Sequence, residues 1–289
     1  MEFHPKVNML LAAPSGSGKT ETFRALKKYF AQHIPHLILD QVDLSNITSA
    51  GFKGKDPGSI LAALVKEGTS YGIIWLDEVD KRILPAHTSG GDNVSAEIQG
   101  QLLTILEGCS EKYMMRGLDE PATIDTNLTM FIASGAFNMV REKKKVAQVK
   151  TMGFVQQKEQ YEIYNAISRE DIISMGCLYE LLGRFHLLVN YRKLSESAVL
   201  KIIELSKSKI ESELGMKLLL SEEFTEEMLS SSNQDFGCRL LTSMIYQPAL
   251  FACKDVFLQG LEHPEVTIYC GGRYEIQEGK ADSDYEQSQ

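Results

Sequence analysis

Two short segments constrain the fold of this chain more than any other feature. The first follows an apolar run and precedes a stretch with apolar residues at helical spacing, and it reads Ala13-Pro14-Ser15-Gly16-Ser17-Gly18-Lys19-Thr20. A strand, a glycine-rich turn and a helix in this order predict a phosphate-binding loop, although Ala13 replaces its leading glycine. The backbone N–H groups of such a turn and of the helix N-terminus point at phosphate oxygens. Lys19 would then reach the β- and γ-phosphates, and the Thr20 hydroxyl would bind Mg²⁺.

The second segment is an apolar run that ends in two carboxylates, Ile73-Ile74-Trp75-Leu76-Asp77-Glu78. A buried strand would place both acids at its tip. We assign Asp77 to magnesium, through its water, and Glu78 to the orientation of an attacking water. The alternative is that both acids cap a helix at the end of the strand. Because the two segments occur together and in this order, we expect a chain that binds a nucleoside triphosphate and hydrolyses it.

Strand-like and helix-like stretches alternate along the first part of the chain. The expected strands are 7–12, 37–40, 73–76 and 127–134, and the expected helices are 21–32, 59–66 and 95–107. Such alternation predicts an α/β fold with a parallel sheet covered by helices on both faces. Ligands of such sheets bind at the carboxyl ends of the strands.

After about Val189 the pattern becomes helical. Ser195 is a candidate N-cap, and two further helices and one strand are expected at 222–230, 239–257 and 265–270. We therefore expect a large nucleotide-binding domain at 1–189, a smaller helical domain at 190–270, and a disordered acidic tail at 271–289.

The composition excludes several classes of protein. No apolar stretch approaches the roughly 20 residues of a membrane span, and no secretion signal is evident, so we expect a cytoplasmic protein. The net charge of −9 argues against a nucleic-acid partner. The five cysteines are scattered and match neither a zinc site nor a disulfide framework.

The motifs resemble those of the ClpX family of ring-forming AAA+ unfoldases. The resemblance is carried by blocks in the family's order at 72–81, 94–103, 131–137, 179–184 and 237–239. It implies a P-loop NTPase domain of three layers followed by a mainly helical lid. It also implies an ATPase that uses ATP and magnesium in a homo-hexameric ring to unfold protein substrates, without peptidase activity of its own.

The resemblance assigns roles to three more residues. Arg184 matches the arginine finger, which reaches the phosphates bound by the neighbouring subunit. Arg239 matches the sensor-2 arginine of the small domain, and Ser134 lies near the sensor-1 position. The alternative for either arginine is a surface salt bridge.

Two further matches concern partners. Gly51-Phe52-Lys53-Gly54 occupies the place of the family's aromatic pore loop, which grips polypeptide in the channel of the ring. Met152-Gly153-Phe154 occupies the place of the loop that docks on the ClpP peptidase, so a ClpP-like partner is implied. The alternative for Phe52 is a turn whose ring packs into the core.

One related protein family and two other functions compete with this interpretation. HslU shares the end of the 127–134 strand, but it carries a large inserted domain for which the interval between Glu78 and Phe131 is too short. The resemblance also leads us to expect that the zinc-binding adaptor domain and the segment covering the adenine are missing. Two other functions therefore stay open: a nucleotide-gated binding module, and a remodeller of protein complexes that works without a peptidase.

Overall fold

The computed structural model describes residues 6–47, 57–86, 93–113, 119–151, 166–192, 194–231 and 237–279. The chain divides into two compact units. The first consists of residues 1–14 and 19–192, and the second of residues 15–18 and 193–289. Each unit has hydrophobic clusters of its own and is described by itself. The division at 192/193 falls close to the domain boundary expected at 189/190.

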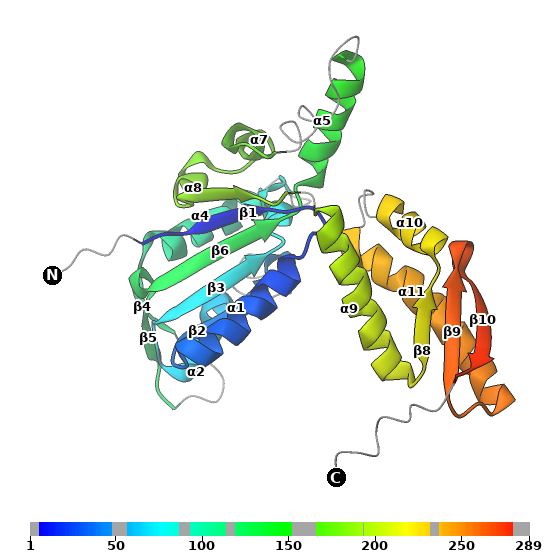
Figure 1. The fold of residues 1–289 in the computed structure, drawn as a ribbon. Helices are drawn as coiled ribbons and strands as arrows, with labels where there is room; N and C mark the ends of the chain where they lie inside the picture. Colours follow the sequence, from blue (N-terminus) through cyan, green and yellow to red (C-terminus); the bar gives the residue numbers. More distant parts are fainter. Residues whose placement is uncertain are drawn as a thin grey trace. The chain divides into compact units, whose positions relative to one another are not determined.

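Five parallel strands form the central sheet of the first unit (Figure 1). They are β1 (Met9–Ala12), β2 (Ile38–Asp43), β3 (Gly72–Asp77), β6 (Thr129–Gly135) and β7 (Leu187–Asn190). Their order across the sheet is β2-β3-β6-β1-β7, and every neighbouring pair is parallel. The alternating strand and helix pattern of the sequence therefore produced the parallel sheet that it predicted.

Successive side chains of each strand point to opposite faces, and this alternation builds three layers. Leu10 and Leu76 belong to a cluster on one face, whereas Leu11 and Trp75 belong to a cluster on the other. Helix α1 (Lys19–His33) covers the second face, where Phe23 is buried. Helices α4 (Val94–Glu107) and α8 (Tyr179–Gly183) cover the first face (Figure 1).

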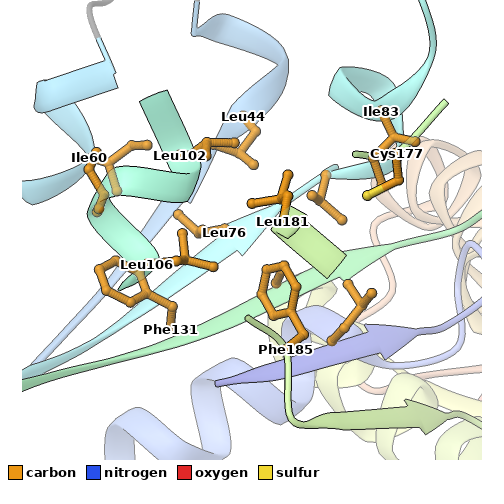
Figure 2. Close-up of a cluster of buried hydrophobic side chains, with 14 of the residues drawn as sticks. Leu44, Ile60, Leu76, Ile83, Leu102, Leu106, Phe131, Cys177, Leu181 and Phe185 are labelled. Atoms are coloured by element: carbon orange, nitrogen blue, oxygen red, sulfur yellow. The ribbon is translucent and has the colours of Figure 1, made fainter. Parts of the chain in front are cut away.

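Figure 2 shows the cluster beneath α4 and α8. Leu76 and Phe131 of the sheet lie there beside Leu102 and Leu106 of α4, and Leu181 of α8 completes the layer. All five side chains are at most 2% exposed. Burial on this scale fixes the strand register, because a shift by one residue would turn these side chains to the other face.

The remaining elements of the first unit surround this framework. The helices are α2 (Ala62–Glu67), α3 (Asp80–Ile83), α5 (Asn138–Thr151) and α7 (Arg169–Ser174), with 3₁₀ turns at Leu44–Asn46, Pro57–Leu61 and Thr126–Leu128. An antiparallel hairpin is formed by β4 (Ser110–Tyr113) and β5 (Ala122–Asp125).

The second unit is mainly helical. Its helices are α9 (Glu196–Leu214), α10 (Glu222–Ser231) and α11 (Gly237–Gln259). They pack on a three-stranded sheet of β8 (Lys217–Leu220), β9 (Pro264–Tyr269) and β10 (Arg273–Glu278), in the order β10-β9-β8. Ser195 is the N-cap of α9, as predicted, and its hydroxyl accepts a hydrogen bond from the Ala198 N–H.

The disorder expected from residue 271 onward is wrong for Arg273–Glu278. This segment forms β10, which pairs antiparallel with β9 along its whole length. Its sequence is polar because one face is exposed, and the other face packs on the core of the second unit through the partly buried Tyr274 and Ile276. Residues 271 and 272 belong to a 3₁₀ turn, Cys270–Gly272, and residues 280–289 lie outside the described residues. Among the described helices none is long and apolar enough to cross a membrane.

Candidate functional site

The carboxyl edge of the sheet holds the start of the first sequence motif and the end of the second. Strand β6 lies between β1, which leads into the glycine-rich loop, and β3, which ends in Asp77. Backbone hydrogen bonds also join β6 to the residues that directly follow β1 and β3. The Ala13 N–H donates to the Gly135 carbonyl at 2.9 Å, and the Val79 N–H donates to the Ser134 carbonyl at 3.0 Å. The start of the loop and the turn after β3 are therefore fixed to a common strand.

The glycine-rich loop has the backbone conformation that its sequence demands. Gly16 and Gly18 have φ of 74° and 95°, a region that favours glycine. Ala13 has no such φ, which explains why alanine serves where the motif usually has glycine. The Lys19 ammonium donates to the carbonyls of Ala13 and Pro14, at 2.7 and 3.3 Å, so it lies over the loop. Lys19 and Thr20 open helix α1, whose N-terminus favours anions.

The Asp77 carboxylate is held by three donors. Oδ1 accepts from the Ser134 hydroxyl at 2.7 Å and from the Glu78 N–H at 3.0 Å, and Oδ2 accepts from Gln41 Nε2 at 3.0 Å. Ser134 is fully buried and also accepts from the indole N–H of Trp75 at 2.9 Å. Ser134, predicted near the sensor-1 position, thus lies in direct contact with the predicted magnesium ligand.

Glu78 lies in a strained backbone conformation. Its φ is 58°, a region that costs a non-glycine residue on the order of 1–3 kcal/mol. Its carboxylate forms an ion pair with Lys81 at 2.5 Å and is 40% exposed. The hydrogen bond to Glu78 raises the pKa of Lys81 above its usual value. The turn thus directs Glu78 away from the strand and toward solvent, where a water could reach it.

A second strained residue supports the same edge. Phe137, with φ of 54°, is fully buried, and its N–H donates to Asp80 Oδ2 at 3.0 Å. Asp80 is the first residue of α3, so this bond ties the end of β6 to that helix. Gly135 leaves room for the contact, because a Cβ there would meet Asp80 Oδ1 at 2.9 Å.

Arg184 lies at the other end of the sheet. Its carbonyl accepts a hydrogen bond from Asn8, immediately before β1, and its guanidinium pairs with Glu107 at the end of α4. The loop and Asp77 are at the carboxyl ends of β1 and β3. The structure therefore does not bring Arg184 to the same edge as the other candidates of the first unit, and its side chain is 46% exposed.

The structure does not relate the remaining candidate residues to the carboxyl edge of the sheet. Arg239 is an exposed residue near the start of α11 in the second unit. The predicted pore loop, 51–54, and the predicted docking tripeptide, 152–154, lie outside the described residues.

The donor set fits magnesium bound together with a nucleotide. In the described part of the chain no cluster of three or more His, Cys, Asp or Glu could hold a metal ion by itself. Thr20 and Asp77 offer one hydroxyl and one carboxylate. Mg²⁺ is commonly bound in this way, through one or two protein oxygens, substrate phosphates and water.

Sequence reasoning missed Gln41 and the role of Trp75. Trp75 carries a usable signal, since a buried indole N–H normally finds an acceptor and Trp75 is 1% exposed. Gln41 carries a weaker signal, a polar side chain inside a strand. Its partner follows from the register that sets Gln41 beside Trp75 on β3, which the sequence does not reveal.

Comparisons with known proteins agree with this geometry. Residues 4–188 match the model of the AAA domain (Cdc48 subfamily), which covers more than half of the chain. The chain belongs to the AAA family.

Several curated relatives of this AAA protein are named ClpX, the ATP-binding subunit of the ATP-dependent Clp protease. ClpX 2 of Wolinella succinogenes is 31% identical over 85% of this chain and 66% of its own length. ClpX of Treponema denticola is 32% identical over 68% of this chain and 51% of its own. ClpX 3 of Methylococcus capsulatus is 28% identical over 83% of this chain and 61% of its own length. The chain is thus ClpX-like, and it spans between about half and two thirds of the length of these relatives.

Proposed function

We propose that this chain binds Mg·ATP at the carboxyl edge of its sheet and hydrolyses it. The observation that supports the proposal is the attachment of Ala13, at the start of the glycine-rich segment, and of Asp77 to the same strand, β6. The loop N–H groups and Lys19 would hold the phosphates, and Thr20 and Asp77 would hold the metal. Magnesium, when bound, supplies positive charge that offsets the charge on the phosphates.

Glu78 is proposed to orient the attacking water. Its neighbour Asp77 is fixed by three donors, whereas the Glu78 carboxylate is partly exposed and contacts Lys81. A carboxylate at this place can accept a proton from water while the water attacks the terminal phosphate. The positive φ of Glu78 is the kind of strain that accumulates at functional sites.

We further propose that hydrolysis takes place between subunits of a homo-hexameric ring. Arg184 lies at the amino edge of the sheet, away from the loop of its own chain. An exposed arginine there could serve a neighbour's nucleotide, as an arginine finger supplied in trans does. Arg239 is proposed to sense the nucleotide from the second unit.

The work that we propose for ATP hydrolysis is protein unfolding, with a ClpP-like peptidase as partner. Support comes from the relatives named as ATP-binding subunits of the Clp protease. Phe52 is the proposed substrate-gripping residue, and Met152 and Phe154 are the proposed anchors on the peptidase.

The substitution Glu78→Gln tests the hydrolysis. The amide keeps the size of the side chain but cannot take a proton, so ATP turnover should fall at least about 100-fold while ATP binding persists. Steady-state phosphate release and binding of a fluorescent ATP analogue measure the two quantities.

The matched control is Glu204→Gln, which also removes an ion pair with a lysine three residues later, in the second unit. It should turn over ATP at the wild-type rate. Near wild-type turnover in Glu78→Gln would refute the role of Glu78.

A further inference from the structure

The hydrogen bonds around Asp77 leave one acceptor position open. A carboxylate oxygen can accept about two hydrogen bonds. Oδ1 already accepts two, from Ser134 and from the Glu78 N–H. Among the described residues Oδ2 accepts from Gln41 alone. Oδ2 therefore keeps the position through which Asp77 can receive a metal-bound water.

Trp75 determines the direction of the Ser134 proton. An indole N–H can only donate, so the Ser134 hydroxyl must be the acceptor at 2.9 Å. Its single hydrogen is then available for Asp77 Oδ1 at 2.7 Å. Trp75 is 1% exposed and Ser134 is fully buried, so bulk solvent does not reach the Ser134 hydroxyl.

The same indole also contacts the helix that carries Thr20. Trp75, Asp77 and Ser134 lie on the sheet face that α1 covers. The ring of Phe23, in the first turns of α1, packs edge-on against Trp75 with centroids 5.8 Å apart. Trp75 thus belongs to the strand that carries Asp77 and packs on the helix that carries Thr20, the two candidate magnesium ligands of this chain.

We propose that Trp75 and Ser134 are positioning residues that hold Asp77 with Oδ2 toward the magnesium site. The proposal rests on the proposed binding of Mg·ATP, and it adds two residues that do not themselves contact phosphate or metal. Trp75 acts through Ser134, and Ser134 acts directly on the carboxylate. Since Trp75 is the single tryptophan of the chain, its fluorescence reports on this contact without background.

A double-mutant cycle tests this relay, in which Trp75 acts on Asp77 through Ser134. The variants are Ser134→Ala, Trp75→Phe and both together, with Ser134→Thr as the conservative variant. The measured quantity is the Mg²⁺ concentration that half-saturates binding of a fluorescent ADP analogue. Loss of an outer-shell partner typically weakens metal binding by about 10–100-fold, so Ser134→Ala should raise this concentration about tenfold or more.

Because Trp75 acts through Ser134, adding Trp75→Phe to Ser134→Ala should change nothing further. Ser134→Thr should restore most of the magnesium affinity, since it keeps the hydroxyl. Tyr191→Phe is the matched control: it removes a hydrogen bond from Tyr191 to Thr22 in the same unit and should leave the magnesium dependence unchanged.

Fluorescence provides a second readout. Mg·ADP should change the emission of Trp75 in the wild type and change it much less in Ser134→Ala. A purely structural role predicts lower thermal stability with unchanged magnesium dependence, and that result would overturn the proposal. Independent, multiplying effects of the two substitutions would also overturn it. If the wild type binds no nucleotide at all, the proposed function itself fails; if it binds but the variants match it, only the relay fails.

Discussion

Asp77 and Glu78 are neighbours in the chain, but their carboxylates have different surroundings. Three donors fix Asp77, whereas Glu78 is partly exposed and forms an ion pair with Lys81. A metal ligand benefits from fixed geometry, and a group that orients water must be reachable by water. The difference between these two environments supports separate roles for the two acids.

Lys6 is an unusual residue in front of β1. Its ammonium donates to the Thr126 carbonyl at 2.7 Å and lies 5.0 Å from the centre of the Phe131 ring. Burial lowers the pKa of Lys6 to about 8. In the unfolded chain Lys6 keeps its proton up to about pH 10. Between these values unfolding takes up a proton, so stability increases as the pH rises.

We therefore predict that the wild type gains stability relative to Lys6→Met between pH 8 and pH 10. Urea unfolding of both proteins at several pH values measures the difference. Lys66→Met, which removes an exposed lysine of α2, should show no such trend. A difference between wild type and Lys6→Met that is independent of pH would contradict the prediction.

At the scale of elements, α7 and α8 hold the backbone around Arg184. Arg169 of α7 donates to the carbonyls of Leu182 at 3.0 Å, Phe185 at 2.5 Å and His186 at 3.3 Å. Helix α7 in turn begins with a capping box between Ser168 and Asp171. The position of Arg184 therefore depends on the N-terminus of a short helix.

Asp171 makes this helix sensitive to acid. Burial alone would raise the pKa of Asp171, but hydrogen bonds from Lys144 and from the Ser168 N–H outweigh it, and the net effect lowers the pKa. A group with a lowered folded-state pKa stabilises the protein above its unfolded value of about 3.9 and loses this effect as the pH falls below that value.

Asp171→Asn should accordingly lower the free energy of unfolding by about 1 kcal/mol at neutral pH. The deficit should shrink as the pH falls below about 4, because the unfolded wild-type chain then takes up a proton at Asp171 before the folded chain does. Urea unfolding of the two proteins at pH 7 and at pH 3.5 checks this. An equal deficit at both pH values would show that the charge of Asp171 does not matter.

The sequence predicted the elements with strong patterns and missed those without them. The strand ending in Asp77 and the helix after the glycine-rich loop were predicted because apolar periodicity and turn chemistry agree there. The hairpin β4–β5 and strand β10 were not, since short exposed strands are set by their partners rather than by their own residues. The bonds from Gln41 and Trp75 depend on register, which no local pattern specifies.

At the scale of the whole molecule, the proposed ring needs two chains for each active site. The loop, Asp77 and Glu78 lie at the carboxyl edge of the sheet, whereas Arg184 lies at the amino edge. Arg184→Ala and Glu78→Gln should each be nearly inactive alone. Arg24→Ala, which breaks another exposed arginine–glutamate pair, is the control for Arg184→Ala and should stay active.

The measurement that tests this claim most directly is the ATPase rate of an equal mixture of Arg184→Ala and Glu78→Gln chains. If the chains form the proposed ring, some sites of a mixed ring combine an intact Glu78 with an intact Arg184 from the neighbour. Random mixing makes this about one site in four, so about a quarter of the wild-type rate should return. A mixture as inactive as its two components, under conditions where the subunits exchange, would contradict hydrolysis at a site shared between chains.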